Sequence, residues 1–445
     1  MSHRQAGQGL ELPATGLLTD HYELTMVRAA LRSGAARRRS VFEVFARQLP
    51  TGRRYGVVAG AGRLLDALER FRFGSAELEF LERAGIADGP TLEFLRAYRF
   101  GGSIWGYGEG DCYFPGSPIL VVEGTFAEAV ILETVALSIL NHDCAIASAA
   151  SRMVTAAGER PLIEMGSRRT HELAAIAAAR AAYIAGFATT SNLRAGYQYG
   201  VPTSGTAAHA FTLVHDDERQ AFSAQLDALG TGTTVLADTY DVPAAIDLAV
   251  RLAGPALGAV RIDSGDLAAA AREVRAQLDR LGADKARIVL TGDLDEFSIA
   301  ALAAEPVDGY GVGTSLVTGS GAPTAALVYK LVARAVTEGN DAPLLPVAKR
   351  SVGKPSRGGR KWAVRQLSAA GTATAELVTD TEPADSAEGR PLLRLLMRHG
   401  EIVGRESLAA ARARHQAAVT ELPAYARQLT RGYPSIPTVF QPDRD

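Results

Sequence analysis

The stretch Arg261-Ile262-Asp263-Ser264-Gly265-Asp266, which continues the apolar run 257–260, joins a predicted strand to a cluster of polar groups. The run is rich in the β-branched and apolar residues that favour a buried strand. Helical sequence follows at 267–278, and either Ser264 or Asp266 is placed to cap it. Taken alone, the stretch predicts only a strand and a capped helix. Its significance comes from the repetition of the same pattern before and after it.

Short apolar runs alternate with helical sequence from about residue 160 to about residue 330. Seven such runs lie at 161–164, 185–188, 200–202, 234–237, 259–262, 288–290 and 309–312. Alternation of strand and helix is typical of parallel strands, and seven units in succession predict an α/β fold with an irregular (β/α)7-type barrel. The third run is weak, so a doubly wound sheet is the alternative.

The two ends of the chain have a different character. Residues 1–150 mix helical and strand patterns, and residues 346–445 contain a predicted antiparallel pair at 362–367 and 372–378. We therefore expect 1–150 and 346–445 to be the N-terminal and C-terminal parts of one mixed α+β domain. The barrel at 151–345 would lie beside it as the catalytic domain.

A helix is predicted to begin near residue 20. Asp20 is a favourable N-cap residue, and Glu23 stands three positions later, as in a capping box. The apolar residues Leu24 and Val27 share one face of this helix. Tyr22 falls in its first turn, where a packing aromatic is the simplest interpretation of the residue by itself.

Composition limits the partners of this chain. It has 445 residues and a formal net charge of −2, which indicates neither a nucleic-acid nor a membrane partner. Its two cysteines, Cys112 and Cys144, are too few for a disulfide framework or, by themselves, for a zinc site. The polar N-terminus lacks the apolar core of a signal peptide. The expected location is the cytoplasm.

Polar side chains concentrate directly after each predicted strand. They include Arg168 and Arg169 after the first, Thr206 and His209 after the third, Asp238 after the fourth, Arg261 and Asp263 after the fifth, Thr291, Gly292 and Asp293 after the sixth, and Gly313 and Thr314 after the seventh. In a parallel barrel the carboxyl ends of the strands share one rim, which holds the active site. Helix capping alone would enrich serine, threonine and aspartate at these positions, but not arginine or histidine.

Three arginines on the rim, Arg168, Arg169 and Arg261, imply an anionic substrate, because a guanidinium group pairs a carboxylate or phosphate bidentately. The glycine-rich segment 309–316 would let backbone N–H groups approach a phosphate closely, and the 291–293 turn could add a second phosphate or ribose contact. Asp263 could hold ribose hydroxyls or, with Asp266, a magnesium ion.

A histidine on the same rim adds reactive chemistry. Thr206 and His209 would share a face of a first helical turn, since they stand three residues apart. Asp238 could fix the tautomer of His209, which suits general acid–base work or a nucleophilic nitrogen. From the residues alone, we predict a barrel enzyme that binds a phosphorylated sugar and a second anion.

Four segments, taken as a set, resemble nicotinate phosphoribosyltransferase. They are Leu18-Thr19-Asp20-His21-Tyr22-Glu23-Leu24-Thr25-Met26, Gly205-Thr206-Ala207-Ala208-His209, Arg261-Ile262-Asp263-Ser264-Gly265-Asp266 and Gly311-Val312-Gly313-Thr314. The resemblance spans nearly the whole chain. It implies the barrel and the mixed terminal domain, and transfer of phosphoribose from 5-phosphoribosyl 1-pyrophosphate to nicotinate. The implied products are nicotinate mononucleotide and pyrophosphate, in NAD biosynthesis or salvage.

The resemblance also implies coupling to ATP hydrolysis. His209 would be the phosphorylated residue and Asp238 would orient it, with Mg²⁺ neutralising the pyrophosphate. Tyr22 would stack on the pyridine ring, reaching in from the second subunit of a homodimer. The remaining substrate contacts implied are Thr206 and Arg261 to nicotinate, assisted by Arg168 or Arg169, and Asp263, Gly292, Asp293, Gly313 and Thr314 to ribose and phosphate.

Two other functions compete with this one. The related nicotinamide phosphoribosyltransferase, by resemblance, has an aspartate after its second barrel strand that accepts the amide N–H. This chain has Ser191 there, and since an aspartate would repel a carboxylate, serine favours nicotinate. The chain could also be an inactive ligand-binding relative, although the intact His209, Asp263 and Thr314 argue against that.

Overall fold

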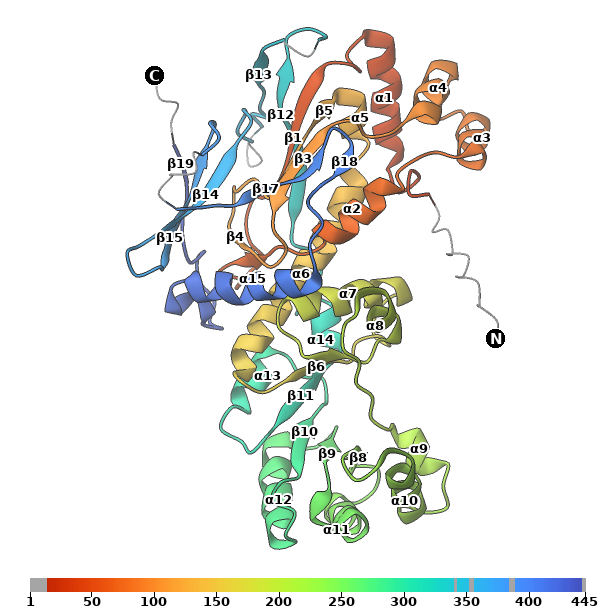
Figure 1. Cartoon of the computed structure of the whole chain (residues 1–445), viewed down its shortest axis with the longest axis vertical. Helices are drawn as coiled ribbons and strands as arrows, with labels where there is room; N and C mark the ends of the chain where they lie inside the picture. Colours follow the sequence, from red (N-terminus) through yellow and green to blue (C-terminus); the bar gives the residue numbers. More distant parts are fainter. Residues whose placement is uncertain (1–13, 340–341, 352–355, 384–388, 442–445) are drawn as a thin grey trace, which may run out of the picture.

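Two large β-sheets and one long helix organise the chain (Figure 1). The computed structural model describes residues 14–339, 342–351, 356–383 and 389–441. A mixed region with an antiparallel sheet fills the upper half of Figure 1, and a parallel sheet with its helices fills the lower half. Helix α6 (Glu133–Ala157) contacts both, because it packs against β12 (Leu327–Ala335) and against α13 (Glu296–Ala301).

The seven-stranded antiparallel sheet combines strands from both ends of the chain, in the order β13-β12-β1-β5-β3-β17-β18. Its other members are β1 (Arg39–Ala46), β3 (Ser103–Tyr107), β5 (Leu120–Thr125), β13 (Leu344–Pro346), β17 (Leu393–Arg398) and β18 (Glu401–Ile402). The helices of this region are α1 (His21–Ser33), α2 (Ala61–Glu69), α3 (Ser75–Arg83), α4 (Gly89–Ala97) and α5 (Phe126–Val130). Their apolar faces and the sheet share one hydrophobic core.

Two smaller sheets complete this half. The first has the order β16-β14-β15-β19 and the second pairs β2 with β4. Their bounds are β14 (Trp362–Leu367), β15 (Ala373–Thr379), β16 (Arg390–Pro391), β19 (Thr438–Phe440), β2 (Gly56–Val57) and β4 (Cys112–Tyr113). The antiparallel pairing of β14 with β15 confirms the pair predicted at 362–378. Both cysteines are free and buried.

The second large sheet is entirely parallel, in the order β7-β6-β11-β10-β9-β8. Its strands are β6 (Leu162–Glu164), β7 (Thr189–Thr190), β8 (Thr234–Leu236), β9 (Ala259–Ile262), β10 (Arg287–Leu290) and β11 (Gly309–Val312). The helices between them are α7 (Glu172–Ile184), α8 (Leu193–Tyr199), α9 (His209–Leu213), α10 (Glu218–Leu229), α11 (Val242–Ala253), α12 (Leu267–Arg280) and α13, with α14 (Thr314–Val317) after β11. Because the first strand, β6, pairs with the last, β11, the sheet curls like part of a barrel.

Six strands form where seven were predicted. The third run, 200–202, forms no strand, because Gly200 ends α8 in the left-handed conformation with φ 69°. Only the next residue, Thr203, makes an isolated parallel bridge, with Thr190. The second strand was also predicted too early: α7 continues to Ile184, Gly186 turns the chain with φ 119°, and pairing begins at Thr189. Within the described residues the ladder runs from this bridge to β8, and the curled sheet is a half-barrel.

The start of α1 is as predicted, but its capping box is wrong. Asp20 is the N-cap residue, yet its side chain makes no capping hydrogen bond. Glu23 is fully buried, and its carboxylate accepts hydrogen bonds from the backbone N–H of Thr134, at 2.8 Å, and from the hydroxyl of Thr19. The Glu23 side chain is therefore buried against α6 and does not cap α1 as the local pattern predicted.

One helical stretch, Phe126–Ala157, is long and apolar enough to pass a composition test for a membrane span. Of its most apolar window, 67% is buried inside the molecule, which is the behaviour of a core helix. The stretch is also broken at residues 131–132, where α5 ends and α6 begins. It carries no argument for a membrane.

The strand β12 and the first two residues of β13 lie within the range 151–345 that was assigned to the barrel. Both belong to the antiparallel sheet, since β12 pairs with β1 from Ser40 to Ala46 and β13 pairs with β12. The parallel sheet ends earlier in the chain, at Val312. The division into 1–150, 151–345 and 346–445 stays a prediction, and its second boundary falls after β12 and inside β13.

Candidate active site

A pocket of about 150 Å³ lies at the carboxyl ends of the parallel strands. It is lined by Met165, Arg168, Arg169, Arg261, Asp263, Thr291, Gly292, Asp293, Gly311, Gly313 and Thr314. These residues follow β6, β9, β10 or β11, or end those strands. Parallel strands deliver their carboxyl ends to one edge, so residues up to 149 positions apart in the sequence meet here. We refer to it as the rim pocket.

Arg261 and Asp263 form the charged centre of the rim pocket. The Arg261 Nη2 atom lies 3.1 Å from Asp263 Oδ1, and Arg261 Nε donates a hydrogen bond to Thr291 Oγ1 at 2.9 Å. The Thr291 hydroxyl in turn donates to the same oxygen of Asp263. Burial alone would raise the pKa of Asp263, but the Thr291 hydroxyl and the Arg261 guanidinium more than offset this and lower it.

The predicted histidine–aspartate pair is present beside the rim pocket. His209 Nε2 lies 3.2 Å from Asp238 Oδ1, and the Asp238 side chain is only 3% exposed. The second oxygen, Asp238 Oδ2, accepts hydrogen bonds from Asp263 N at 2.9 Å and from Ser264 Oγ at 2.7 Å. One buried carboxylate thus connects the imidazole to the loop that carries Asp263.

Thr206 reaches the same network by a route that differs from the prediction. Residues 205–208 are not helical, and α9 begins at His209, so the two side chains do not share a helical face. Instead Thr206 Oγ1 accepts a hydrogen bond from Arg261 Nη1 at 3.0 Å. Thr206 is therefore connected to the rim pocket by its hydrogen bond with Arg261, and His209 is connected to it by its contact with Asp238.

Two glycines allow the pocket walls to approach each other. A Cβ atom on Gly311 would lie 2.5 Å from Thr291 Cγ2, and one on Gly292 would lie 2.5 Å from the carbonyl oxygen of Asp263. Gly292 also has φ 118°, a region that other residues rarely adopt. Glycine is required at these two positions because the chain inside β11 and directly after β10 runs against its neighbours.

The loop bearing Arg168 and Arg169 is anchored by Glu164, a residue whose role was not predicted. Glu164 is fully buried at the end of β6, where its carboxylate accepts hydrogen bonds from Gly166 N at 2.5 Å and from the Thr190 hydroxyl. Burial raises its pKa. Met165 was also missed, since an apolar residue next to a strand end carries no sequence signal for a site.

Asp266 is a helix cap. Its Oδ1 atom accepts hydrogen bonds from Ala268 N and Ala269 N, both at 3.1 Å, at the start of α12. The capping prediction is confirmed. The prediction that Asp263 and Asp266 bind a magnesium ion together loses support, because Oδ1 of Asp266 already accepts two hydrogen bonds from the helix. No cluster of three or more histidine, cysteine, aspartate or glutamate side chains suited to a metal occurs in the part of the chain that the structure describes.

Tyr22 lies away from the rim pocket. It is 47% exposed on α1, which Figure 1 places at the opposite end of the molecule from β8, β9 and α9. Partial burial, followed by the nearby carboxylates of Glu133 and Glu23, raises its pKa to about 12. The prediction that Tyr22 reaches the substrate from a second subunit stays a prediction.

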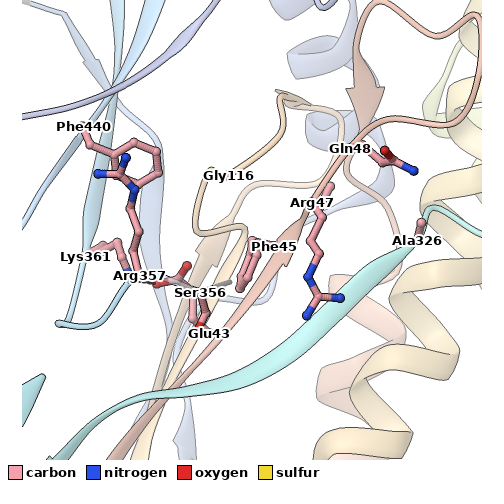
Figure 2. Close-up of a pocket in the computed structure, with 11 residues that line it drawn as sticks. Glu43, Phe45, Arg47, Gln48, Gly116, Ala326, Ser356, Arg357, Lys361 and Phe440 are labelled. Carbon is pink, nitrogen blue, oxygen red and sulfur yellow. Dashed lines mark hydrogen bonds and ion pairs between the residues drawn. The ribbon is translucent and has the colours of Figure 1, made fainter. Parts of the chain in front are cut away.

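A second pocket, of about 760 Å³, lies beside β1 in the upper half of the molecule. Figure 2 shows Arg357 against the ring of Phe440, with the guanidinium carbon 4.0 Å from the ring centroid. Glu43 and Lys361 form a buried ion pair of 2.7 Å on its wall. It is larger than the rim pocket, but none of the predicted site residues lines it, and its lining contains no histidine. We therefore assign the chemistry to the rim pocket.

Comparison with known proteins gives a consistent result. The model of the nicotinate phosphoribosyltransferase (NAPRTase) N-terminal domain matches residues 17–141. Nicotinate phosphoribosyltransferase pncB1 of Mycobacterium tuberculosis H37Rv is 58% identical over 447 residues, which cover 98% of each chain. The Bacillus subtilis enzyme of the same name is 37% identical over 335 residues, 73% of this chain and 68% of that one. The crystal structure of human nicotinic acid phosphoribosyltransferase superposes with a TM-score of 0.80 at 28% identity, covering 95% of this chain and 97% of the human one.

Proposed function

The chain belongs to the nicotinate phosphoribosyltransferase family, and from that premise we propose that it transfers phosphoribose from 5-phosphoribosyl 1-pyrophosphate to nicotinate, giving nicotinate mononucleotide and pyrophosphate. The observation that carries the proposal for the site is the connection, through Asp238, of a histidine to a pocket with three arginines. The reaction would serve NAD biosynthesis in the cytoplasm.

Substrate binding follows from the charges of the pocket. Arg261, Arg168 and Arg169 would pair the nicotinate carboxylate and the phosphates, since guanidinium groups bind both bidentately. Thr206 would hold Arg261 in place and contact nicotinate beside it. The ribose and phosphate contacts proposed are Asp263, Gly292, Asp293, Gly313 and Thr314.

The transfer breaks the bond between C1 of the ribose and the pyrophosphate oxygen and forms a bond from C1 to the pyridine nitrogen. Departure of pyrophosphate leaves positive charge on the ribose, which a fixed carboxylate stabilises most strongly when it is partly removed from water. Asp263 is suited to this, because its lowered pKa keeps it ionised at neutral pH. Mg²⁺ would neutralise the leaving pyrophosphate and be held largely by its oxygens, with Asp263 and Asp293 as the pocket's carboxylates.

ATP coupling would pass through His209. If Nε2–H donates to Asp238, the lone pair of the neutral imidazole lies on Nδ1. That nitrogen would attack the γ-phosphorus of ATP and release ADP, and water would later cleave the phosphohistidine to free phosphate. The added negative charge would act on the Asp263 loop, because Asp238 contacts both.

Tyr22 supports the proposal of a homodimer. It could stack on the pyridine ring only if α1 of a second copy lay over the rim pocket. The partners proposed are therefore the three small-molecule substrates and one further copy of this chain.

Ser191 favours nicotinate over nicotinamide. It lies directly after β7, is exposed, and donates its backbone N–H to Glu164 O at 2.8 Å. A serine here places no negative charge beside an incoming carboxylate.

Product formation from 5-phosphoribosyl 1-pyrophosphate and Mg²⁺ tests the proposal, with nicotinate or nicotinamide, each with and without ATP. A product from nicotinate only, formed faster with ATP and accompanied by ADP, is expected. A product from nicotinamide would overturn the inference from Ser191. No product from either would favour an inactive ligand-binding relative.

A further inference from the structure

We propose that Thr291 is a positioning residue that holds Arg261 and Asp263 in a single-contact ion pair and thereby keeps the second oxygen of Asp263 available to substrate. The inference rests on the proposed function, because it gives Thr291 a part in the same reaction. It differs from the sequence-based expectation that the 291–293 turn contacts phosphate or ribose directly.

Thr291 is placed to act on both charged groups at once. It follows β10 and is only 3% exposed. Its backbone N–H donates to Ile262 O at 2.9 Å, so the sheet fixes its position without help from the side chain. The hydroxyl accepts a hydrogen bond from Arg261 Nε at 2.9 Å and donates its own hydrogen to Asp263 Oδ1.

The hydroxyl determines how the ion pair is made. An arginine and an aspartate this close commonly pair side by side, with two N–H groups on two oxygens. Here Nε is bound to Thr291 and Nη1 to Thr206, so only Nη2 reaches the carboxylate, at 3.1 Å from Oδ1. Both the arginine and the threonine converge on Oδ1. Within the described chain, no hydrogen bond uses Asp263 Oδ2.

Removal of the Thr291 hydroxyl would let Arg261 and Asp263 close into an ion pair with two contacts. Valine has nearly the shape of threonine, so Thr291→Val leaves the packing almost intact while Nε loses its acceptor and Oδ1 loses a donor. The simplest way to satisfy both groups is a two-contact pair between Arg261 and Asp263, which would occupy Oδ2. Binding of the phosphoribosyl donor would then have to break that pair.

The variants Thr291→Val and Thr291→Ser separate this role from simple packing. We expect Thr291→Val to raise the Kd and KM for 5-phosphoribosyl 1-pyrophosphate about tenfold, as for the loss of one buried hydrogen bond to a charged group. Thr291→Ser keeps the hydroxyl and should stay within about twofold of the wild type. Calorimetric binding with Mg²⁺ and steady-state kinetics both read this out.

Thr91→Val is the matched control. Thr91 is fully buried in α4, outside the lining of the rim pocket, and its hydroxyl also donates to an aspartate, Asp88 Oδ1, at 2.5 Å. This variant should lose stability without a change in KM or Kd. A loss of donor affinity in Thr91→Val equal to that in Thr291→Val would contradict the local role of Thr291.

The pH profile supplies a readout that a packing role would not move. Thr291→Val should shift the acidic limb of kcat/KM to lower pH, because closing the pair gives Asp263 a second contact from the Arg261 guanidinium, which favours the ionised carboxylate more than the lost hydroxyl did. The charged or titratable groups around Asp263 are Arg261 on β9, His209 on α9, Asp238 after β8, Arg168 and Arg169 after β6, and Asp293 after β10. All of them are retained in the variant.

Three results would overturn the proposal: unchanged affinity and pH profile in Thr291→Val, equal impairment of Thr291→Ser and Thr291→Val, or no binding of the donor by the wild type. A wild type that binds the donor but makes no product from nicotinate would instead refute the proposed function. The effect of Thr291→Val on the Kd would still test the role of Thr291 in that case.

Discussion

The Nε2 atom of His209 lies 3.2 Å from Oδ1 of the buried Asp238. The other oxygen of that carboxylate holds the loop that bears Asp263. Asp238 would therefore connect the imidazole proposed to be phosphorylated with the carboxylate proposed to bind ribose.

His209→Ala should abolish the stimulation of transfer by ATP while slow transfer continues. Because the phosphoryl acceptor is lost but the arginines and Asp263 remain, the rates with and without ATP should become equal within about twofold. ADP release should fall to background. His215→Ala, which removes an imidazole just beyond the end of α9, is the control and should keep ATP coupling. Unchanged ADP release in His209→Ala would refute the phosphohistidine assignment.

Ser191→Asp should shift the choice of substrate from nicotinate toward nicotinamide. A carboxylate near the acceptor repels another carboxylate and can accept a hydrogen bond from an amide. We expect kcat/KM for nicotinate to fall roughly 10- to 100-fold, a loss of about 1.4–2.7 kcal/mol in transition-state binding. Ser191→Asn, which adds similar bulk without charge, is the control. Equal effects of the two variants would mean that bulk and not charge is sensed.

Tyr22 and His209 should complement each other across subunits. If each rim pocket takes its tyrosine from the partner, a Tyr22→Ala subunit and a His209→Ala subunit form a mixed dimer with one intact site. Random mixing makes about half of the dimers mixed, so co-expression should restore about a quarter of the ATP-dependent activity. Activity no higher than the mean of the two single variants would contradict a shared site.

His415 should make the fold sensitive to acid. It is buried on α15 (Leu408–Glu421), within 3.0 Å of Gly110 O and of Ser151 Oγ, and burial lowers its pKa to about 4. Between pH 6.5 and pH 4, His415 is protonated in the unfolded chain but stays neutral in the folded chain. The stability of the folded chain therefore falls as the pH drops toward 4. The free energy of unfolding should decrease by about 3 kcal/mol over that interval from this residue.

Denaturant unfolding between pH 7 and pH 4 checks this prediction. His415→Gln should flatten the dependence, whereas His171→Gln, which alters an exposed histidine at the start of α7, should not. An unchanged slope in His415→Gln would show that other groups dominate acid unfolding.

The local sequence pattern predicted those strands and helices whose structure depends mainly on their own residues. The β-branched run 259–262 forms β9 with the predicted bounds, and so does the run 309–312 as β11. The prediction failed where long-range packing prevailed. Glu23 does not cap α1 but makes a buried contact with α6. The run near Gly200 is the end of a helix followed by a single bridge, and not a strand.

The site was predictable as a set of residues but not as a geometry. Arg261, Asp263 and the glycine segment could be found because parallel strands bring their carboxyl ends together. The shared carboxylate of Asp238 and the bridging hydroxyl of Thr291 depend on side-chain directions that no spacing encodes. Tyr22 could be found only by resemblance, because nothing in its own segment points to the rim.

The most direct test of the central claim is the crystal structure of the enzyme with nicotinate mononucleotide. The ribose phosphate should lie against Gly292, Gly313 and Thr314, with the nicotinate carboxylate on Arg261 or on the arginines after β6. A nucleotide bound instead in the larger pocket between Arg47, Arg357 and Lys361 would contradict the assignment of the chemistry to the rim pocket.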